Sequence, residues 1–72
     1  MTETEALERF NEATTSADRV SAINACVDIF HTNVLDALAR GDLKEANAIT
    51  ERARGLPIAY AYCRDALRLH KE

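Results

Sequence analysis

The chain has 72 residues, of which 47% are hydrophobic and 29% charged, with two glycines and one proline. This composition is too apolar for a disordered segment, and the length corresponds to a single domain spanning residues 1–72. A domain this small lies near the lower limit at which one hydrophobic core sustains a fold. We therefore expect a folded domain that gains stability from contact with a second subunit.

The net charge of −3 is unevenly distributed along the chain. Residues 1–39 contain seven acidic and two basic residues, a net charge of −5, whereas residues 40–72 contain five acidic and seven basic residues, a net charge of +2. An acidic protein is a poor candidate for binding nucleic acid, because neutralisation of phosphates supplies most of that affinity. Nucleic acid remains an alternative partner because the C-terminal half of the chain is basic.

The first residues predict neither a leader nor a membrane anchor. Met1 is followed by Thr-Glu-Thr-Glu, and no uninterrupted apolar run approaches the roughly 20 residues that a membrane span needs. We expect a cytoplasmic protein. The next residues predict a short amphipathic helix from about Thr2 to Thr14, with Thr2 or Thr4 as its cap and Leu7 and Phe10 on its apolar side.

A long helix from Ser16 to Arg40 is the central element that the sequence predicts. Its apolar residues alternate at steps of three and four, the spacing of one helical face: Val20, Ile23, Val27, Phe30, Val34 and Ala37. Asn24 and His31 lie at the edge of the apolar arc, and a polar residue there can fix the register of packed helices. Gly41 and Asp42 then provide a helix end and a new cap.

Two further helices are predicted after this break, from Asp42 to Arg54 and from about Pro57 to the end. Gly55 and Pro57 separate them, since glycine closes helices and proline suits a first helical turn. The sequence thus predicts an all-α fold, a small three- or four-helix bundle around the central helix. The run from Ala39 to Ala46, with Ala53 and Pro57, resembles the turn of a tetratricopeptide repeat, which implies a helical hairpin over about a quarter of the chain.

No residue pattern predicts catalysis, a cofactor or a metal site. Cys63 and His70 are seven residues apart, which on a helix is about 10 Å and too far for one metal ion. Cys26 and Cys63 are isolated thiols of the kind that is usually buried as a small apolar residue. A chain of this size also leaves little room for a substrate cleft. We therefore expect a protein that is not an enzyme.

Two surfaces are candidates for binding. On the last helix, aromatic and basic residues share one strip at steps of four, four and three: Tyr60, Arg64, Arg68 and Lys71. Tyrosine and arginine are enriched at the energetic centres of protein interfaces, so we expect this strip to bind a partner. On the central helix, small residues and one isoleucine form a strip that a second helix can approach closely, an expected oligomer contact: Ala22, Ala25, Ile29 and Asn33.

Together these features predict a non-enzymatic interaction protein, a small regulator, inhibitor or adaptor that binds a larger protein as a homodimer. One alternative is a nucleic-acid-binding regulator that uses the basic last helix. A second alternative is a small-molecule sensor with a pocket in the bundle core. Binding to mixed DNA or RNA at low salt would distinguish the first alternative, and a thermal shift with metabolites the second.

Overall fold

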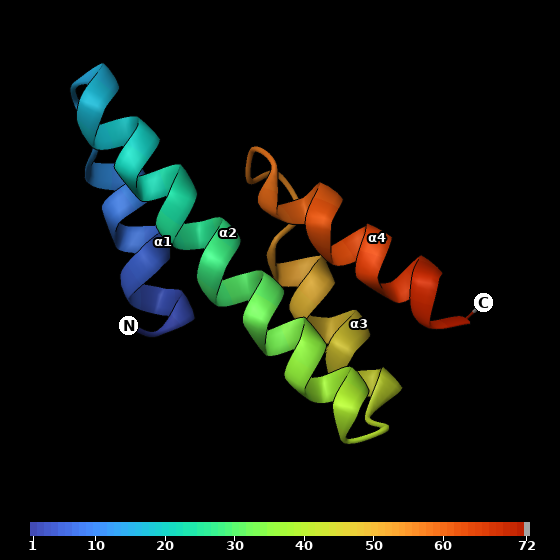
Figure 1. Cartoon of the computed structure of the whole chain (residues 1–72). Helices are drawn as coiled ribbons and strands as arrows, with labels where there is room; N and C mark the ends of the chain where they lie inside the picture. Colours follow the sequence, from blue (N-terminus) through green and yellow to red (C-terminus); the bar gives the residue numbers. More distant parts are fainter. Residues whose placement is uncertain (72) are drawn as a thin grey trace.

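A computed structural model describes residues 1–71 and contains four helices in this range. They are α1 (Glu3–Glu12), α2 (Ser16–Ala39), α3 (Leu43–Arg52) and α4 (Ala59–Lys71), as Figure 1 shows. The fold is an all-α bundle in which α2 is the longest helix, as the sequence predicts. Within residues 1–71 no strand is present, and no helix combines the length and the apolar character of a membrane span.

Three of the four helices begin at a side-chain cap. Thr2 caps α1 in a capping box with Glu5, whose carboxylate accepts the Thr2 backbone N–H at 3.0 Å. Thr15 caps α2, because its hydroxyl accepts the Asp18 backbone N–H at 3.1 Å, and Ser16 is the first helical residue. Asp42 caps α3 in the predicted way. These caps satisfy N–H groups that a helix start leaves without partners.

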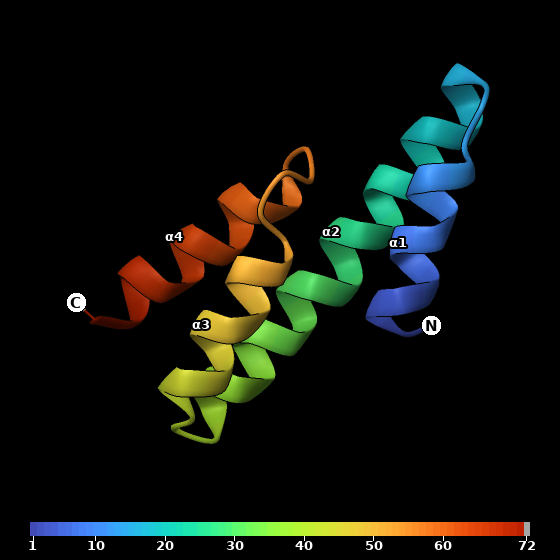
Figure 2. The same ribbon diagram turned by 180° about the vertical axis from the view of Figure 1, so that it is seen from behind.

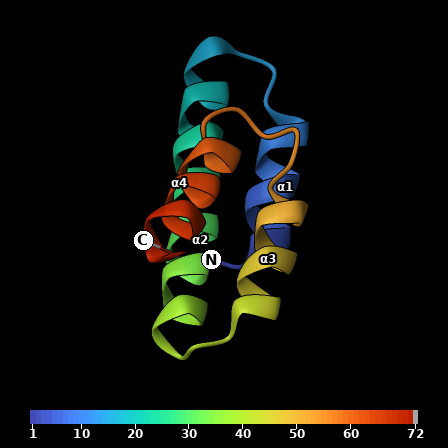
Figure 3. The same ribbon diagram turned by 90° about the vertical axis from the view of Figure 1, so that its right-hand side faces the viewer.

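The arrangement follows from α2, along which the shorter helices pack. Helix α1 packs on the N-terminal part of α2 and α3 on its C-terminal part, on the same side of α2 in Figure 3. Helix α4 packs on both α2 and α3. Seen from either side, α4 accompanies only the α3 half of the molecule (Figures 1 and 2). The other half therefore consists of α1 and α2 alone, which we call the α1–α2 end.

The core lies where α2 meets the other three helices. Phe30, Val34 and Ala37 of the predicted stripe are completely buried, and so is Cys63 of α4. Cys26 is also buried, as expected for an isolated thiol, and its Sγ donates a hydrogen bond to the carbonyl oxygen of Ala6 at 3.4 Å. In the N-terminal half of α2 the core face is therefore rotated from the predicted stripe towards α1, since Ala22 and Cys26 are buried and Val20 is exposed.

The connection between α3 and α4 differs most from the prediction. Helix α4 begins at Ala59 and not at Pro57, because Ile58 has a φ of 68° and cannot continue the helix. The Ala59 N–H donates to the Pro57 carbonyl oxygen at 2.6 Å, which closes a tight γ-turn around Ile58. Gly55 also has a positive φ, of 91°, which glycine adopts without strain.

Candidate interaction surface

An apolar groove runs between the C-terminal parts of α2 and α4, and we call it the α2–α4 groove. Its volume is about 730 Å³, and its walls come from both helices: His31, Leu35, Leu38, Ala39, Tyr62, Asp65, Ala66, Leu69 and His70. Leu69 is 62% exposed, Leu35 48% and Tyr62 47%. Large apolar side chains lie half-exposed beside one another here, and their burial by another molecule is favourable in free energy.

The wall of the groove is ordered by an aromatic contact between its two helices. The rings of His31 and Tyr62 lie 5.3 Å apart, centroid to centroid, at an interplanar angle of 40°. The centroid distance lies within the range of about 4.5–7 Å at which aromatic rings attract one another. Because His31 belongs to α2 and Tyr62 to α4, the contact fixes the spacing of the two walls, and the groove is preformed in the free chain.

The apolar side of α2 continues beyond the groove into the α1–α2 end. Val20 is 57% exposed, and Val27, between Val20 and the groove, is partly buried. Both residues fall on the same side of the helix as His31 and Leu35, by the helical repeat of 3.6 residues. Helix α4 lies along the C-terminal part of α2 (Figure 1), whereas Val20 belongs to the N-terminal part. The apolar surface of α2 is therefore longer than the groove.

Comparisons with known protein families, curated proteins and solved structures find no match to this chain. The surface itself is therefore the basis for a functional proposal.

The predicted partner strip of α4 lies away from the core. Tyr60 is partly buried, and Arg64 and Arg68 are exposed. The Arg64 guanidinium stands 5.7 Å from the centre of the Tyr60 ring, and Arg68 pairs with Asp65 at 3.5 Å. Both arginines thus have a contact within their own helix. The side chain of Lys71 lies outside the described residues, although its backbone ends α4.

The small-residue strip of α2 faces α1. Ala22 is buried, and Ala25, Ile29 and Asn33 are partly buried. Asn33 donates a hydrogen bond from Nδ2 to the Glu3 carboxylate of α1 at 2.8 Å. The close helix approach that the sequence indicates at this strip is therefore made within the chain, by α1. The oligomer contact that the sequence suggests at this strip stays a prediction.

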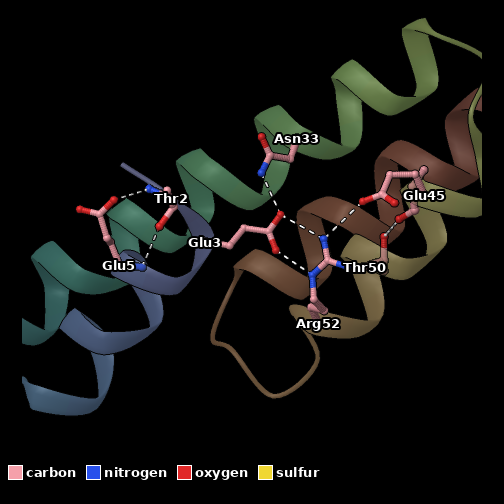
Figure 4. A network of polar contacts seen from close by, with 8 residues as sticks. Thr2, Glu3, Glu5, Asn33, Glu45, Thr50 and Arg52 are labelled. Carbon is pink, nitrogen blue, oxygen red and sulfur yellow. Dashed lines mark hydrogen bonds and ion pairs between the residues drawn. The ribbon is translucent and has the colours of Figure 1, made fainter.

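A polar network joins three helices at the start of α1 (Figure 4). Glu3 accepts from the Arg52 Nε at 2.8 Å and from Asn33, and Arg52 also pairs with Glu45 at 3.4 Å. Partial burial raises the pKa of Glu3, but the hydrogen bonds from Arg52 and Asn33 and the Arg52 charge outweigh it, so the pKa of Glu3 lies below its ordinary value. Hydrogen bonding to Glu3 likewise raises the pKa of Arg52. The network is a structural clamp between α1 and α3.

The two thiols are not poised for nucleophilic chemistry. Burial raises the pKa of Cys26, and burial together with the nearby Glu3 charge raises the pKa of Cys63 to about 11. A nucleophilic cysteine needs the opposite, a lowered pKa at an accessible site. Among the described residues, no three histidine, cysteine or acidic side chains are grouped so that they could hold a metal ion.

Sequence reasoning did not identify the groove, although it placed most of its residues on helical faces. The missing information was the position of α4 relative to α2, in which Tyr62 and Leu69 stay half-exposed. One signal is present in the sequence: the apolar residues of α4, which include Tyr62, Cys63, Ala66 and Leu69, form an arc wider than one neighbouring helix covers. Such an excess indicates a surface, but not which part of the arc stays exposed.

Proposed function

We propose that the chain is a non-enzymatic protein–protein interaction module whose α2–α4 groove binds an apolar helix of another protein molecule. The observation that carries the proposal is the clustering of Leu35, Tyr62 and Leu69, all half-exposed, around one preformed groove. Insertion of an amphipathic helix into an apolar groove between helices is a common mode of recognition. In this proposal the protein acts on a larger protein, as a small regulator, inhibitor or adaptor, and itself forms a homodimer.

The magnitude of the available burial sets the size of the interface. Complete burial of a leucine contributes about 1.5–3 kcal/mol, so the remaining exposed halves of Leu35, Tyr62 and Leu69 contribute together about 3 kcal/mol. Association costs about 4–15 kcal/mol in lost translational and rotational freedom. The three side chains therefore anchor a partner, and contacts beyond the groove must supply the rest. Val20 and the outward strip of Tyr60, Arg64 and Arg68 are further surfaces for such contacts.

The test is a capture experiment with matched variants. Leu69→Lys places a charge at the groove, while Leu43→Lys changes another exposed leucine, at the start of α3 and outside the groove lining. We expect the wild-type chain and Leu43→Lys to capture the same protein from a lysate of the source cells, and Leu69→Lys to lose it. Equal capture by all three chains, or capture by none, contradicts the proposal.

A second candidate function, sensing of a small apolar molecule, is favoured by the size of the groove. Its volume of about 730 Å³ lies within the 300–1,000 Å³ that is usual for ligand sites. A ligand that binds the folded chain raises its melting temperature by mass action. We expect a true groove ligand to stabilise the wild-type chain and Leu43→Lys, but not Leu69→Lys. If no metabolite in a panel stabilises the wild-type chain and Leu43→Lys more than Leu69→Lys, this candidate function is excluded.

A further inference from the structure

We infer that the α2–α4 groove is a pH-dependent binding site, which holds the apolar helix of its partner while His31 and His70 are neutral and releases it when they are protonated. The inference rests on the proposed function, because it concerns the regulation of the same groove. The chain has two histidines, and both line this groove, His31 from α2 and His70 from α4. Histidine is the side chain that gains a proton as the pH falls from 8 to 5. Each wall of the apolar groove thus carries one group whose charge changes in this range.

A molecule that fills the groove lies against the His31 ring. This ring is 5.3 Å from the Tyr62 ring and one helical turn before Leu35, and Tyr62 and Leu35 are half-exposed side chains that an apolar partner buries. Burial of a charge in apolar surroundings is far more costly than burial of a neutral polar group. The bound state therefore favours the neutral form of His31. His70 is exposed beside Leu69, so it contributes to the extent that the partner covers it.

The charged groups around the groove do not offset an added proton inside it. Asp65 is the one acidic side chain among the described residues of the lining; it is 62% exposed and pairs with Arg68 at 3.5 Å. Its charge is therefore shared with an arginine and screened by water. Asp28, one turn before His31 on α2, is exposed and outside the lining, and none of the described lining residues belongs to α1 or α3. An imidazolium covered by an apolar partner thus loses water without gaining a buried counter-ion.

Protonation acts on the occupant of the groove and leaves its walls in place. A cation within about 6 Å of the centre of an aromatic ring is attracted to that ring. The distance of 5.3 Å between the His31 and Tyr62 rings lies inside this range, so a charged His31 keeps a favourable contact with Tyr62. Because this contact joins α2 to α4, we expect acid to empty the groove without unfolding the chain.

The size of the effect follows from the linkage between binding and protonation. An ordinary histidine titrates near pH 6.5, so its protonated form is in about tenfold excess at pH 5.5 and is scarce at pH 8. A partner that binds the neutral form alone therefore loses about tenfold in affinity between these pH values for one histidine, and about a hundredfold for two. We expect a loss of at least about tenfold, since the partner covers His31 more completely than His70.

A dye-binding titration at pH 8 and pH 5.5 tests the inference. The probe is Nile red, an apolar dye that is uncharged at both pH values, and its fluorescence gives the Kd. Leu69→Lys shows whether the dye binds in the groove, and Leu43→Lys is the matched control outside the lining. The double variant His31→Gln with His70→Gln has polar side chains that do not titrate. The measured quantity is the ratio of the two Kd values, so a variant that binds more weakly at both pH values still reports on protonation.

We expect the Kd of the wild-type chain and of Leu43→Lys to rise at least about tenfold from pH 8 to pH 5.5, and that of the double variant to change less than about twofold. Far-ultraviolet circular dichroism at both pH values checks that each chain is folded. Equal Kd values for the wild-type chain, or a double variant with the wild-type ratio, overturn the inference, while loss of dye binding in Leu69→Lys leaves the proposed function standing. A wild-type chain that binds no dye, or binds it no better than Leu69→Lys, also overturns the inference, and the capture experiment then decides the proposed function separately.

Discussion

The carboxylate of Glu3, the first residue of α1, lies 2.8 Å from the guanidinium of Arg52, the last residue of α3, although 49 positions separate them in the chain. The pair joins the start of one helix to the end of the other. An acidic residue at a helix start and a basic residue at a helix end both interact favourably with the helix dipoles. Because α1 otherwise packs on α2 alone, this contact is what connects α1 directly to α3.

The clamp predicts a stability that depends on pH. The pKa of Glu3 is lowered in the folded chain, so its contribution is complete above the unfolded-state pKa of about 4.3 and is lost as the pH falls through the folded-state value. We expect Glu3→Gln to lower the free energy of unfolding by about 1 kcal/mol near pH 7 and to have little effect near pH 2. Urea unfolding at both pH values checks this, with exposed Glu8→Gln as the control. A Glu3→Gln effect of the same size at both pH values contradicts the clamp.

The unequal burial of α2 predicts unequal effects of two substitutions in the same predicted stripe. Phe30 is completely buried, and Phe30→Ala should cost about 3–5 kcal/mol, a large part of the stability of a domain this small. Val20 is exposed, and Val20→Ala should change the stability of the monomer by less than about 0.5 kcal/mol. Urea unfolding in dilute solution, where self-association is absent, measures both. Similar losses for the two variants would show that the core is not where we describe it.

The γ-turn at Ile58 predicts a stabilising substitution. A β-branched residue with a φ of 68° is strained, and glycine adopts this conformation without that strain. We expect Ile58→Gly to raise the free energy of unfolding by about 1 kcal/mol, since strain of about 1–3 kcal/mol outweighs the larger entropy of the unfolded glycine chain. Ile58→Ala, which keeps a Cβ atom, is the matched control. Destabilisation by Ile58→Gly relative to Ile58→Ala would contradict the strained turn.

The raised pKa of Cys63 predicts a slow thiol. With a pKa of about 11, this thiol has about two orders of magnitude less thiolate near pH 8 than an ordinary cysteine. We therefore expect iodoacetamide to modify Cys63 at least about a hundredfold more slowly in the native chain than in denaturant. Mass spectrometry follows the reaction, and Ala61→Cys supplies an exposed thiol on the same helix as the control. A native Cys63 that reacts as fast as this control would mean that α4 is not held against the core.

The helices were predictable from the sequence because their signals are local. Gly41 and Asp42 mark the end of α2 and the start of α3, and the Thr2 cap of α1 is visible in the order of the residues. The start of α4 was not predictable, because Pro57 favours a helical first turn whereas the tight turn at Ile58 delays the helix to Ala59. Tyr62 and Leu69 remain exposed although α4 packs on both α2 and α3.

The faces of α2 were predictable only in part, because periodicity does not identify the neighbouring element. The alternation of three and four residues places Val20 and Phe30 in the same predicted stripe, yet Val20 is exposed and Phe30 is completely buried. Ala22 and Asn33 looked like an oligomer contact because small and polar residues permit close approach. The approaching helix is α1 of the same chain, which is a long-range relationship that local pattern does not contain.

The most direct test of the groove as an interaction surface is site-specific photo-crosslinking in the source cells. A photoreactive amino acid replaces Leu69 in one variant and Leu43 in another, so both probes sit at exposed positions but only the first lines the groove. We predict that the probe at Leu69 crosslinks the chain to a second protein molecule, whether another copy or a larger protein, and that the probe at Leu43 does not. Absence of a crosslink at Leu69, or equal crosslinking at both positions, would contradict the account.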